Sequence, residues 1–119
     1  MKYLVVLSTI ALLIGCAEKA PSTPEQQWQG YCKSVGNAGR TIMLDRQNAI
    51  EKDKALAHAN KVEDEMTRQF VLEAIELVYA MPEEKLNDDV KARRDEFRAV
   101  MEQKCLATPF EKLPDYKQF

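Results

Sequence analysis

The sequence predicts an all-α fold, a small bundle of three to four helices. Three segments carry apolar residues at intervals of three, four or seven positions, which places those residues on one face of an α-helix. No segment alternates between apolar and polar residues for long enough to indicate a β-strand. The 119 residues are enough for one small domain, so these helices are expected to share a single core.

The first fifteen residues differ in composition from the rest of the chain. Lys2 supplies a positive start, and residues 3–14 are apolar except for Ser8 and Thr9. A helix that crosses a membrane needs about 20 such residues, whereas the apolar core of a secretory signal needs about 7–15. Residues 1–15 are therefore predicted to be a cleaved signal peptide and are left out of the fold prediction.

This predicted signal ends in Leu13-Ile14-Gly15-Cys16, which resembles a bacterial lipobox. The resemblance implies that Cys16 is lipidated, that cleavage occurs just before it, and that it becomes the first residue of the mature chain. By the same resemblance, Ala17 in place of aspartate favours sorting to the outer membrane. The alternative is ordinary secretion with cleavage after Gly15, which leaves Cys16 as a free thiol. Because two or more acyl chains hold a protein stably on a bilayer, the lipidated chain would stay tethered to the membrane.

Residues 16–24, with two prolines and several small residues, are predicted to be a flexible tether, followed by a helical domain over 25–107. Thr23 is a suitable cap for a helix that begins at Pro24, and Gln26 stands three residues after Thr23, as in a capping box. This first helix is predicted to run to about residue 48. Its apolar stripe comprises Trp28, Cys32, Val35, Gly39, Ile42 and Ala49.

Two glycines and one tryptophan in this helix carry specific expectations. Gly36 and Gly39 each cost about 1 kcal/mol relative to alanine in a helix. Gly39 falls on the apolar stripe, where the close approach of another helix would explain it, and a break of the helix over 34–39 is the alternative. Trp28 begins the stripe and is expected to cover the open end of the bundle, with a position at the lipid interface as the alternative.

The middle of the chain predicts a short helix and a long one. A turn is expected over 48–54, where Asp53 is a suitable cap for the short helix, which places three residues on one side, Leu56, Ala59 and Asn60. The next helix, over about 62–80, is the most apolar segment after the signal and is predicted to form the centre of the core. Pro82 stops it.

The last predicted helix is capped by Asn87, with Asp88 and Asp89 in the first turn, where negative charge interacts favourably with the helix dipole. Its inward face comprises Val90, Phe97, Met101 and Cys105, with Leu86 just before it. Residues 108–119 contain two prolines and three aromatic residues. They are predicted to form an extended C-terminal tail, with partial packing by Phe110 or Tyr116.

Of the three cysteines, Cys16 is the predicted site of lipid attachment. The other two, Cys32 and Cys105, lie on the apolar faces of the first and last predicted helices. An exported chain meets an oxidising compartment, and lipidation of Cys16 leaves only Cys32 and Cys105 as thiols. A disulfide between them closes a loop of about 74 residues and stabilises the fold by roughly 4 kcal/mol in the chain-entropy description. Two buried free thiols, or pairing between molecules, are the alternatives.

Several short motifs resemble a group of small helical exported proteins. They are WQGYC at 28–32, AGRTIMLDRQ at 38–47, LVYAMP at 77–82, and the closing Cys105. In that group a Tyr-Cys pair precedes an Ile-Met-x-x-Arg-Gln segment, and a Tyr-x-x-Pro sequence ends a helix. The resemblance extends from Trp28 to Leu106. It implies the helical fold and the disulfide, and it implies no reaction.

No motif predicts catalysis, a metal or a cofactor. His58 is the one histidine, and the short His/Cys spacings of metal sites are absent, so a solvated helical histidine is the simpler interpretation. Ser34 lacks the sequence context of a nucleophile, and the paired carboxylates fall on polar helix faces. The four glycines form no phosphate-binding loop. The chain is therefore predicted not to be an enzyme.

Arg46 and Gln47 form the most informative polar pair. Arg46 continues the apolar stripe one turn after Ile42. In a structural interpretation, Arg46 caps the last carbonyls of the first helix and pairs with a carboxylate on the 62–80 helix, such as Glu73. Contact with an anion or a partner is the functional alternative.

These observations predict a lipid-anchored protein of the bacterial cell envelope, in the outer membrane and facing the periplasm. Its predicted role is non-enzymatic, in protein interaction or envelope maintenance, with an envelope protein as partner. The alternative is a small binding module or inhibitor that acts on an envelope enzyme or an incoming element. Without Lys2, the 17 basic residues become 16 against 19 acidic ones, a formal charge of −3. Because no basic run occurs either, nucleic acid and anionic lipid surfaces are not expected as partners.

Overall fold

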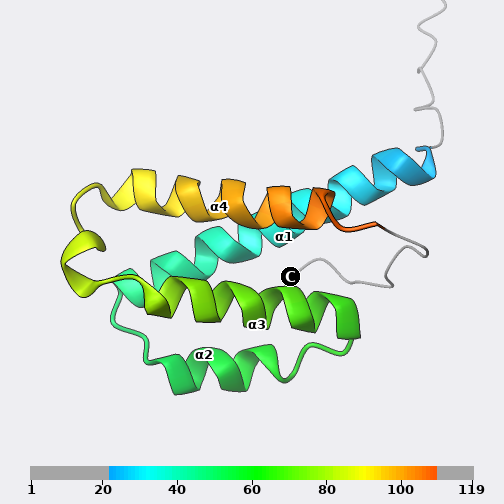
Figure 1. Ribbon diagram of the computed structural model, residues 1–119. Helices are drawn as coiled ribbons and strands as arrows, with labels where there is room; N and C mark the ends of the chain where they lie inside the picture. Colours follow the sequence, from blue (N-terminus) through cyan, green and yellow to red (C-terminus); the bar gives the residue numbers. More distant parts are fainter. Residues whose placement is uncertain (1–21, 110–119) are drawn as a thin grey trace, which may run out of the picture.

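Between residues 22 and 109, four α-helices and one short 3₁₀ helix build the fold (Figure 1). The computed structural model describes residues 22–109, and within that range there is no strand, which confirms the all-α prediction. The elements are α1 (Pro24–Gln47), α2 (Lys52–Ala59), α3 (Glu65–Ala80), η1 (Glu83–Lys85) and α4 (Val90–Leu106). The predicted signal peptide, Cys16 with most of the predicted tether, and residues 110–119 of the predicted tail lie outside the described residues. None of the described helices is both long enough and apolar enough to cross a membrane.

α1 begins where its capping residues predict. The N–H of Gln26 donates to Thr23 Oγ1 (3.1 Å), and the N–H of Thr23 donates to Gln26 Oε1 (2.9 Å), which completes the capping box. Pro24 occupies the first turn, where its missing N–H costs no helical hydrogen bond. The helix continues unbroken through residues 34–39, so the alternative of a break there is wrong.

α1 and α4 pack at very close range. A Cβ built on Gly39 would lie 2.8 Å from the carbonyl oxygen of Phe97 and 2.7 Å from Met101 Cγ. A Cβ on Gly36 would lie 2.9 Å from the carbonyl oxygen of Arg98. Such distances are shorter than van der Waals contact, so only glycine permits this approach. The expectation for Gly39 is therefore confirmed, and Gly36 has the same role one turn earlier.

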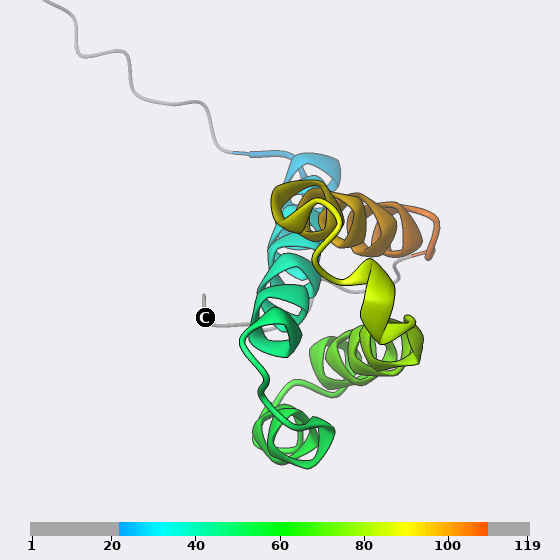
Figure 2. The ribbon, with the colours of Figure 1, turned by 90° about the vertical axis from the view of Figure 1, so that its left-hand side faces the viewer.

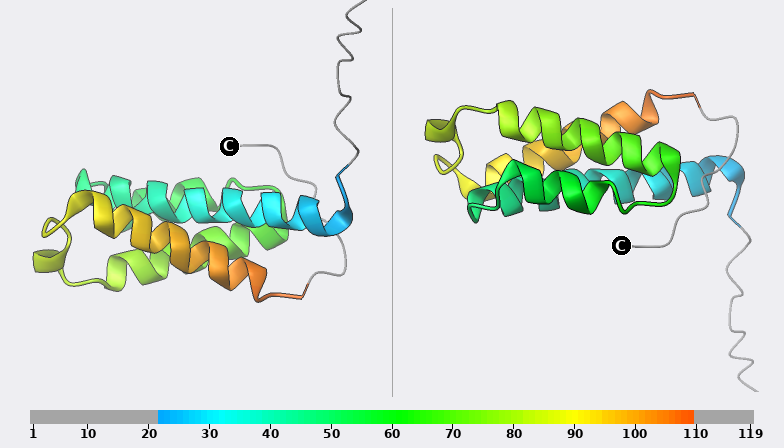
Figure 3. Two further views of the ribbon diagram at one scale, coloured as in Figure 1. Left: turned by 90° about the horizontal axis from the view of Figure 1, so that it is seen from above. Right: turned by 90° about the horizontal axis from the view of Figure 1, so that it is seen from below.

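The disulfide between Cys32 and Cys105 joins the same two helices. The two Cα atoms lie 5.3 Å apart, and both residues are fully buried. The intramolecular pairing predicted from the sequence is confirmed, and the alternative of two free thiols is wrong. In the view from above, α4 lies along α1 (Figure 3, left). In the view from below, α2 and α3 are in front (Figure 3, right).

The helix at the centre of the core is α1, not the predicted 62–80 helix. α1 packs against both α4 and α3 and contributes the most buried residues, which are Trp28, Tyr31, Cys32, Val35, Gly36, Gly39, Ile42 and Met43. α3 is more apolar along its length, but Leu77 is 37% exposed and Val71 is only half-buried. The prediction failed because mean hydropathy does not show how closely and over what length a neighbouring helix packs, and α1 packs closely along α4.

The starts of α2 and α3 differ from the predictions. Glu51 is the N-cap of α2, so Asp53 lies in the first turn and does not cap the helix. α3 begins at Glu65 and not at residue 62, because the Asp64 carboxylate accepts hydrogen bonds from the N–H and the hydroxyl of Thr67 (2.8 and 2.7 Å). The chain between the two helices is a turn.

The start of α4 differs as well. Asp89 is the N-cap, since its carboxylate accepts from the N–H of Ala92 (3.0 Å), and Asn87 lies outside the helix. Val90, predicted to face inward, is 38% exposed. Phe97, Met101, Cys105 and Leu86 are buried, as predicted.

α2 packs on α3 and stands apart from α4 (Figure 2). Its buried residues are two alanines, Ala55 and Ala59. The turn that leads into it includes Ala49 at a φ of 62°, a left-handed conformation that alanine rarely adopts. Leu56 also packs against the core, but the two buried side chains of α2 are small, so α2 covers little of the neighbouring α1 surface.

Candidate functional site

Arg46 lies against the C-terminal end of α3. Its guanidinium donates a hydrogen bond to the carbonyl of Val78 and stands 5.5 Å from the ring centroid of Tyr79. It therefore satisfies one of the last carbonyls of α3, and not those of α1. Glu73, the carboxylate expected beside it, pairs instead with Lys104 of α4 (2.8 Å).

Gln47 ties the end of α1 to the connection between η1 and α4. Its Nε2 donates to the carbonyl oxygens of Leu86 (3.0 Å) and Val90 (3.1 Å). Its Oε1 is buried and has no hydrogen-bond partner among residues 22–109. Both members of the Arg46–Gln47 pair are thus engaged by the backbone of other helices within the chain.

Trp28 and Tyr31 close the opposite end of the bundle. Trp28 is 4% exposed, and its ring stacks on Tyr31 at a centroid distance of 5.3 Å. The fully buried Tyr31 hydroxyl lies 2.8 Å from Thr67 Oγ1, which in turn donates to Asp64. This chain of hydrogen bonds joins α1 to the start of α3. Trp28 therefore covers the end of the core, as predicted.

An open, largely apolar groove of about 320 Å³ lies between α1 and α2. We call it the α1–α2 groove. From α1 its lining includes Ala38, Thr41, Ile42 and Asp45, and from α2 it includes Ala55, His58 and Ala59. Val71 and Ile75 of α3 contribute further apolar side chains, and Ile50 and Val62 come from the segments before and after α2. The groove exists because α2 rests on α3 and faces α1 with alanines.

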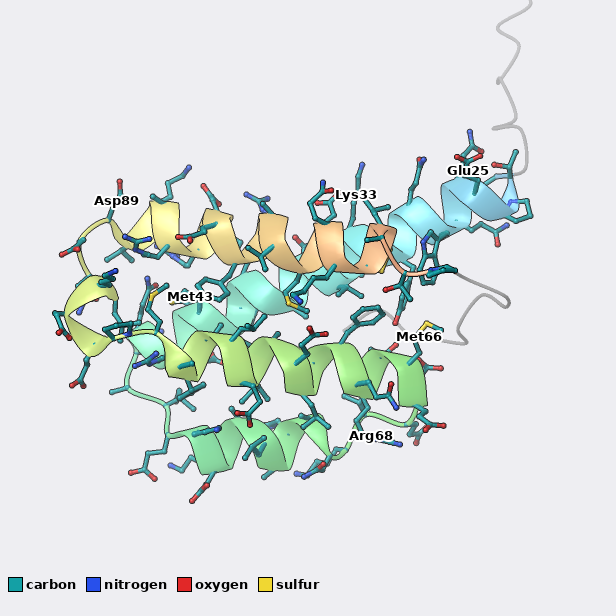
Figure 4. The ribbon with its side chains drawn as sticks, viewed as in Figure 1. Glu25, Lys33, Met43, Met66, Arg68 and Asp89 are labelled. Atoms are coloured by element: carbon teal, nitrogen blue, oxygen red, sulfur yellow. A yellow bond between two sulfur atoms is a disulfide. The ribbon has the colours of Figure 1, made fainter. Side chains whose placement is uncertain are left out.

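Side chains of α3 fix the segments on either side of α2. The Tyr79 hydroxyl donates to the carbonyl of Ile50 (2.6 Å), and Arg68 donates to the carbonyl of Val62 (3.0 Å), near the loop between α2 and α3 (Figure 4). Lys52 adds an exposed ion pair with Glu76 of α3 (2.9 Å). These contacts tie both flanks of α2 to α3, which favours a preformed α1–α2 groove.

Three polar side chains border this groove. Thr41 is engaged, because its hydroxyl donates to the carbonyl of Asn37 (3.0 Å). Asp45 is half-buried, and among the described residues no cation or hydrogen-bond donor contacts its carboxylate. His58 is exposed and belongs to no ion pair within that range. Burial raises the pKa of the Tyr79 hydroxyl, the negative charge of Asp45 raises it further, and Arg46 opposes both effects.

A surface cluster of charges links α1 to α4 away from the groove. Asp95 contacts Arg98 (2.7 Å), Lys91 (3.1 Å) and, across the helix interface, Arg40 (3.7 Å). The hydrogen bond from Lys91 is the main cause that lowers the pKa of the Asp95 carboxyl. These contacts are exposed and reinforce helix packing only weakly.

The residues considered for catalysis are dispersed. Ser34 is on α1, where its hydroxyl donates to the carbonyl of Gly30 (3.4 Å), and His58 is on α2. Among residues 22–109, no group of three or more His, Cys, Asp or Glu side chains is arranged to hold a metal ion.

The α1–α2 groove was not apparent from the sequence. Its signal was a set of alanines, Ala38, Ala55 and Ala59, at positions where larger apolar residues would have filled the space.

This chain matches no known protein-family pattern, no curated protein and no solved structure.

Proposed function

We propose that this chain is a lipid-anchored binding protein of the bacterial cell envelope, with no enzymatic activity. In this proposal, Cys16 carries the lipid, the outer membrane holds the anchor, and the helical domain faces the periplasm. The partner is an envelope protein that docks in the α1–α2 groove. The lipobox-like Leu13–Cys16 sequence supports the anchor, and a buried disulfide suits an oxidising compartment.

The observation that carries the binding role is the preformed α1–α2 groove. Its volume of about 320 Å³ is at the lower end of the range typical for binding pockets, roughly 300–1,000 Å³. Apolar side chains and a few polar ones line such pockets, as they do here. A groove of this size suits a few protein side chains.

The anchor is tested by fractionation of cells that produce the full chain or its Cys16→Ala variant. We expect the unaltered chain in the membrane fraction and the variant unprocessed or displaced from it. Normal processing and membrane association of the variant would refute lipidation at Cys16.

The binding role is tested by photo-crosslinking in intact cells. A photoreactive residue replaces Thr41 at the groove or, as a matched control on the same helix, Lys33, which points away from the bundle (Figure 4). We expect a crosslinked envelope protein from position 41 and none from position 33. Identical products at both positions, or none at position 41, would count against binding in the groove.

A further inference from the structure

We propose that the occupant of the α1–α2 groove is a helical segment of the partner that bears apolar residues and one lysine or arginine, which pairs with Asp45. This inference rests on the proposed binding function and adds the chemistry of the partner. It depends on the shape of the groove and on the one carboxylate at its border.

The shape of the groove suits a helix. On its α1 side, Ala38, Thr41 and Asp45 follow one another at intervals of three and four residues, so they form a ridge about 10 Å long. An apolar ridge of a partner helix at positions i, i+4 and i+7 has the same length. Ala55 and Ala59 on the α2 side are small enough to let that ridge enter.

The charge of Asp45 determines what else the partner must carry. Any body that fills the groove removes water from this half-buried carboxylate, for which the described residues supply no cation. Burial of an unpaired charge is strongly unfavourable, whereas an opposite charge on the partner compensates for it. Arg46 cannot serve, because its guanidinium is directed at Val78 and Tyr79 of α3. His58, on the opposite side of the groove, forms no ion pair with Asp45.

The unpaired Asp45 carboxylate disfavours two other occupants. A symmetric contact between two copies would place the same acidic groove on both sides of the interface. An acyl chain would cover Asp45 and bring no charge. A basic apolar helix satisfies both the apolar lining and the carboxylate.

The test uses two synthetic 15-residue helical peptides with leucines at positions i, i+4 and i+7. One peptide has a lysine in the turn after the leucines, and the other has a glutamate there. Their binding to the full chain in nanodiscs is measured by fluorescence anisotropy. We expect the lysine peptide to bind about fivefold more tightly, the size of one partly exposed ion pair.

Three variants locate the effect. Asp45→Asn should abolish the difference between the peptides, whereas Glu63→Gln, which removes an exposed charge outside the groove, should leave it unchanged. Ala38→Leu, which narrows the groove, should weaken the binding of both peptides. Circular dichroism establishes that each variant is folded.

Several results would overturn the inference. They are equal affinity of the two peptides, peptide binding that Ala38→Leu does not weaken, and peptide binding that tightens when residues 110–119 are deleted. A dimer of the full chain that Ala38→Leu dissociates would also overturn it. If neither peptide binds while position 41 still crosslinks to an envelope protein, this inference fails and the proposed function stands. If that crosslink is also lost, both this inference and the proposed function fail.

Discussion

Substitution of Gly39 by alanine tests how closely α1 and α4 must approach. The added methyl would lie 2.8 Å from the Phe97 carbonyl oxygen, a backbone atom that moves only if the helices separate. The Cys32–Cys105 disulfide, two turns earlier on α1, opposes that separation. Gly30 offers a matched control on the same helix, because a Cβ there meets nothing within 4 Å.

The two substitutions should have opposite effects. Each gains about 1 kcal/mol of helix propensity. At Gly39 the clash is with a backbone oxygen, so we expect overpacking to cost about 2–3 kcal/mol, the upper part of the usual range. Subtracting the propensity gain leaves a net destabilisation of about 1–2 kcal/mol. Gly30→Ala should stabilise by up to about 1 kcal/mol. For a domain of this size, 1 kcal/mol corresponds to roughly 4–8 °C, so the melting temperatures of the variants should differ by about 10–20 °C.

Urea denaturation followed by circular dichroism, with the disulfide intact, measures the free energy of unfolding of both variants. A Gly39→Ala protein as stable as the unaltered chain would refute the close contact. Equal stabilisation by both substitutions would lead to the same conclusion, since propensity alone would then explain both.

Three further predictions follow from contacts within the bundle. Joint replacement of Cys32 and Cys105 by alanine should lower the free energy of unfolding by about 4 kcal/mol, because the disulfide joins residues 73 apart; an unchanged urea midpoint would contradict this. Arg46→Met removes the hydrogen bond to the Val78 carbonyl and the contact with the Tyr79 ring. This variant should lower the free energy of unfolding by about 1–2 kcal/mol, measured by thermal denaturation. An unchanged melting temperature would argue against a structural role. The Asp95 carboxyl has its pKa lowered below its ordinary value of 3.8, so its contribution to stability is present above pH 3.8 and is lost as the pH falls through the folded-state pKa. Asp95→Asn should therefore lower the melting temperature at pH 7 more than at pH 2.5, and an equal effect at both would refute the linkage.

The features that were predicted well from the sequence depend on residues close together in the chain or on a single pair of cysteines. Thr23, Pro24 and Gln26 form the predicted capping box, because its hydrogen bonds join residues three apart. The disulfide followed from the position of Cys32 and Cys105 on inward helical faces. The capping box has the same physical basis in an isolated segment as in the folded chain, and the disulfide required only that two inward-facing thiols meet.

Helix starts with competing caps were predicted less well. Asn87, Asp88 and Asp89 are all good N-cap residues, so local preference does not choose among them. The structure selects Asp89, and Gln47 of α1 holds the preceding backbone at Leu86. A contact between residues 39 positions apart is not visible in local sequence.

The sequence by itself determined the all-α class, the course of α1, and the covalent link between its first and last helices. Only the tertiary structure decided that α1 is central, that Arg46 reaches α3, and that α2 leaves a groove beside α1. The periodicity of a helix shows which of its faces is apolar, but not which neighbour covers that face or how closely. The alanines of α2 illustrate this limit: Ala55 and Ala59 are buried, and their small side chains line the groove beside Asp45.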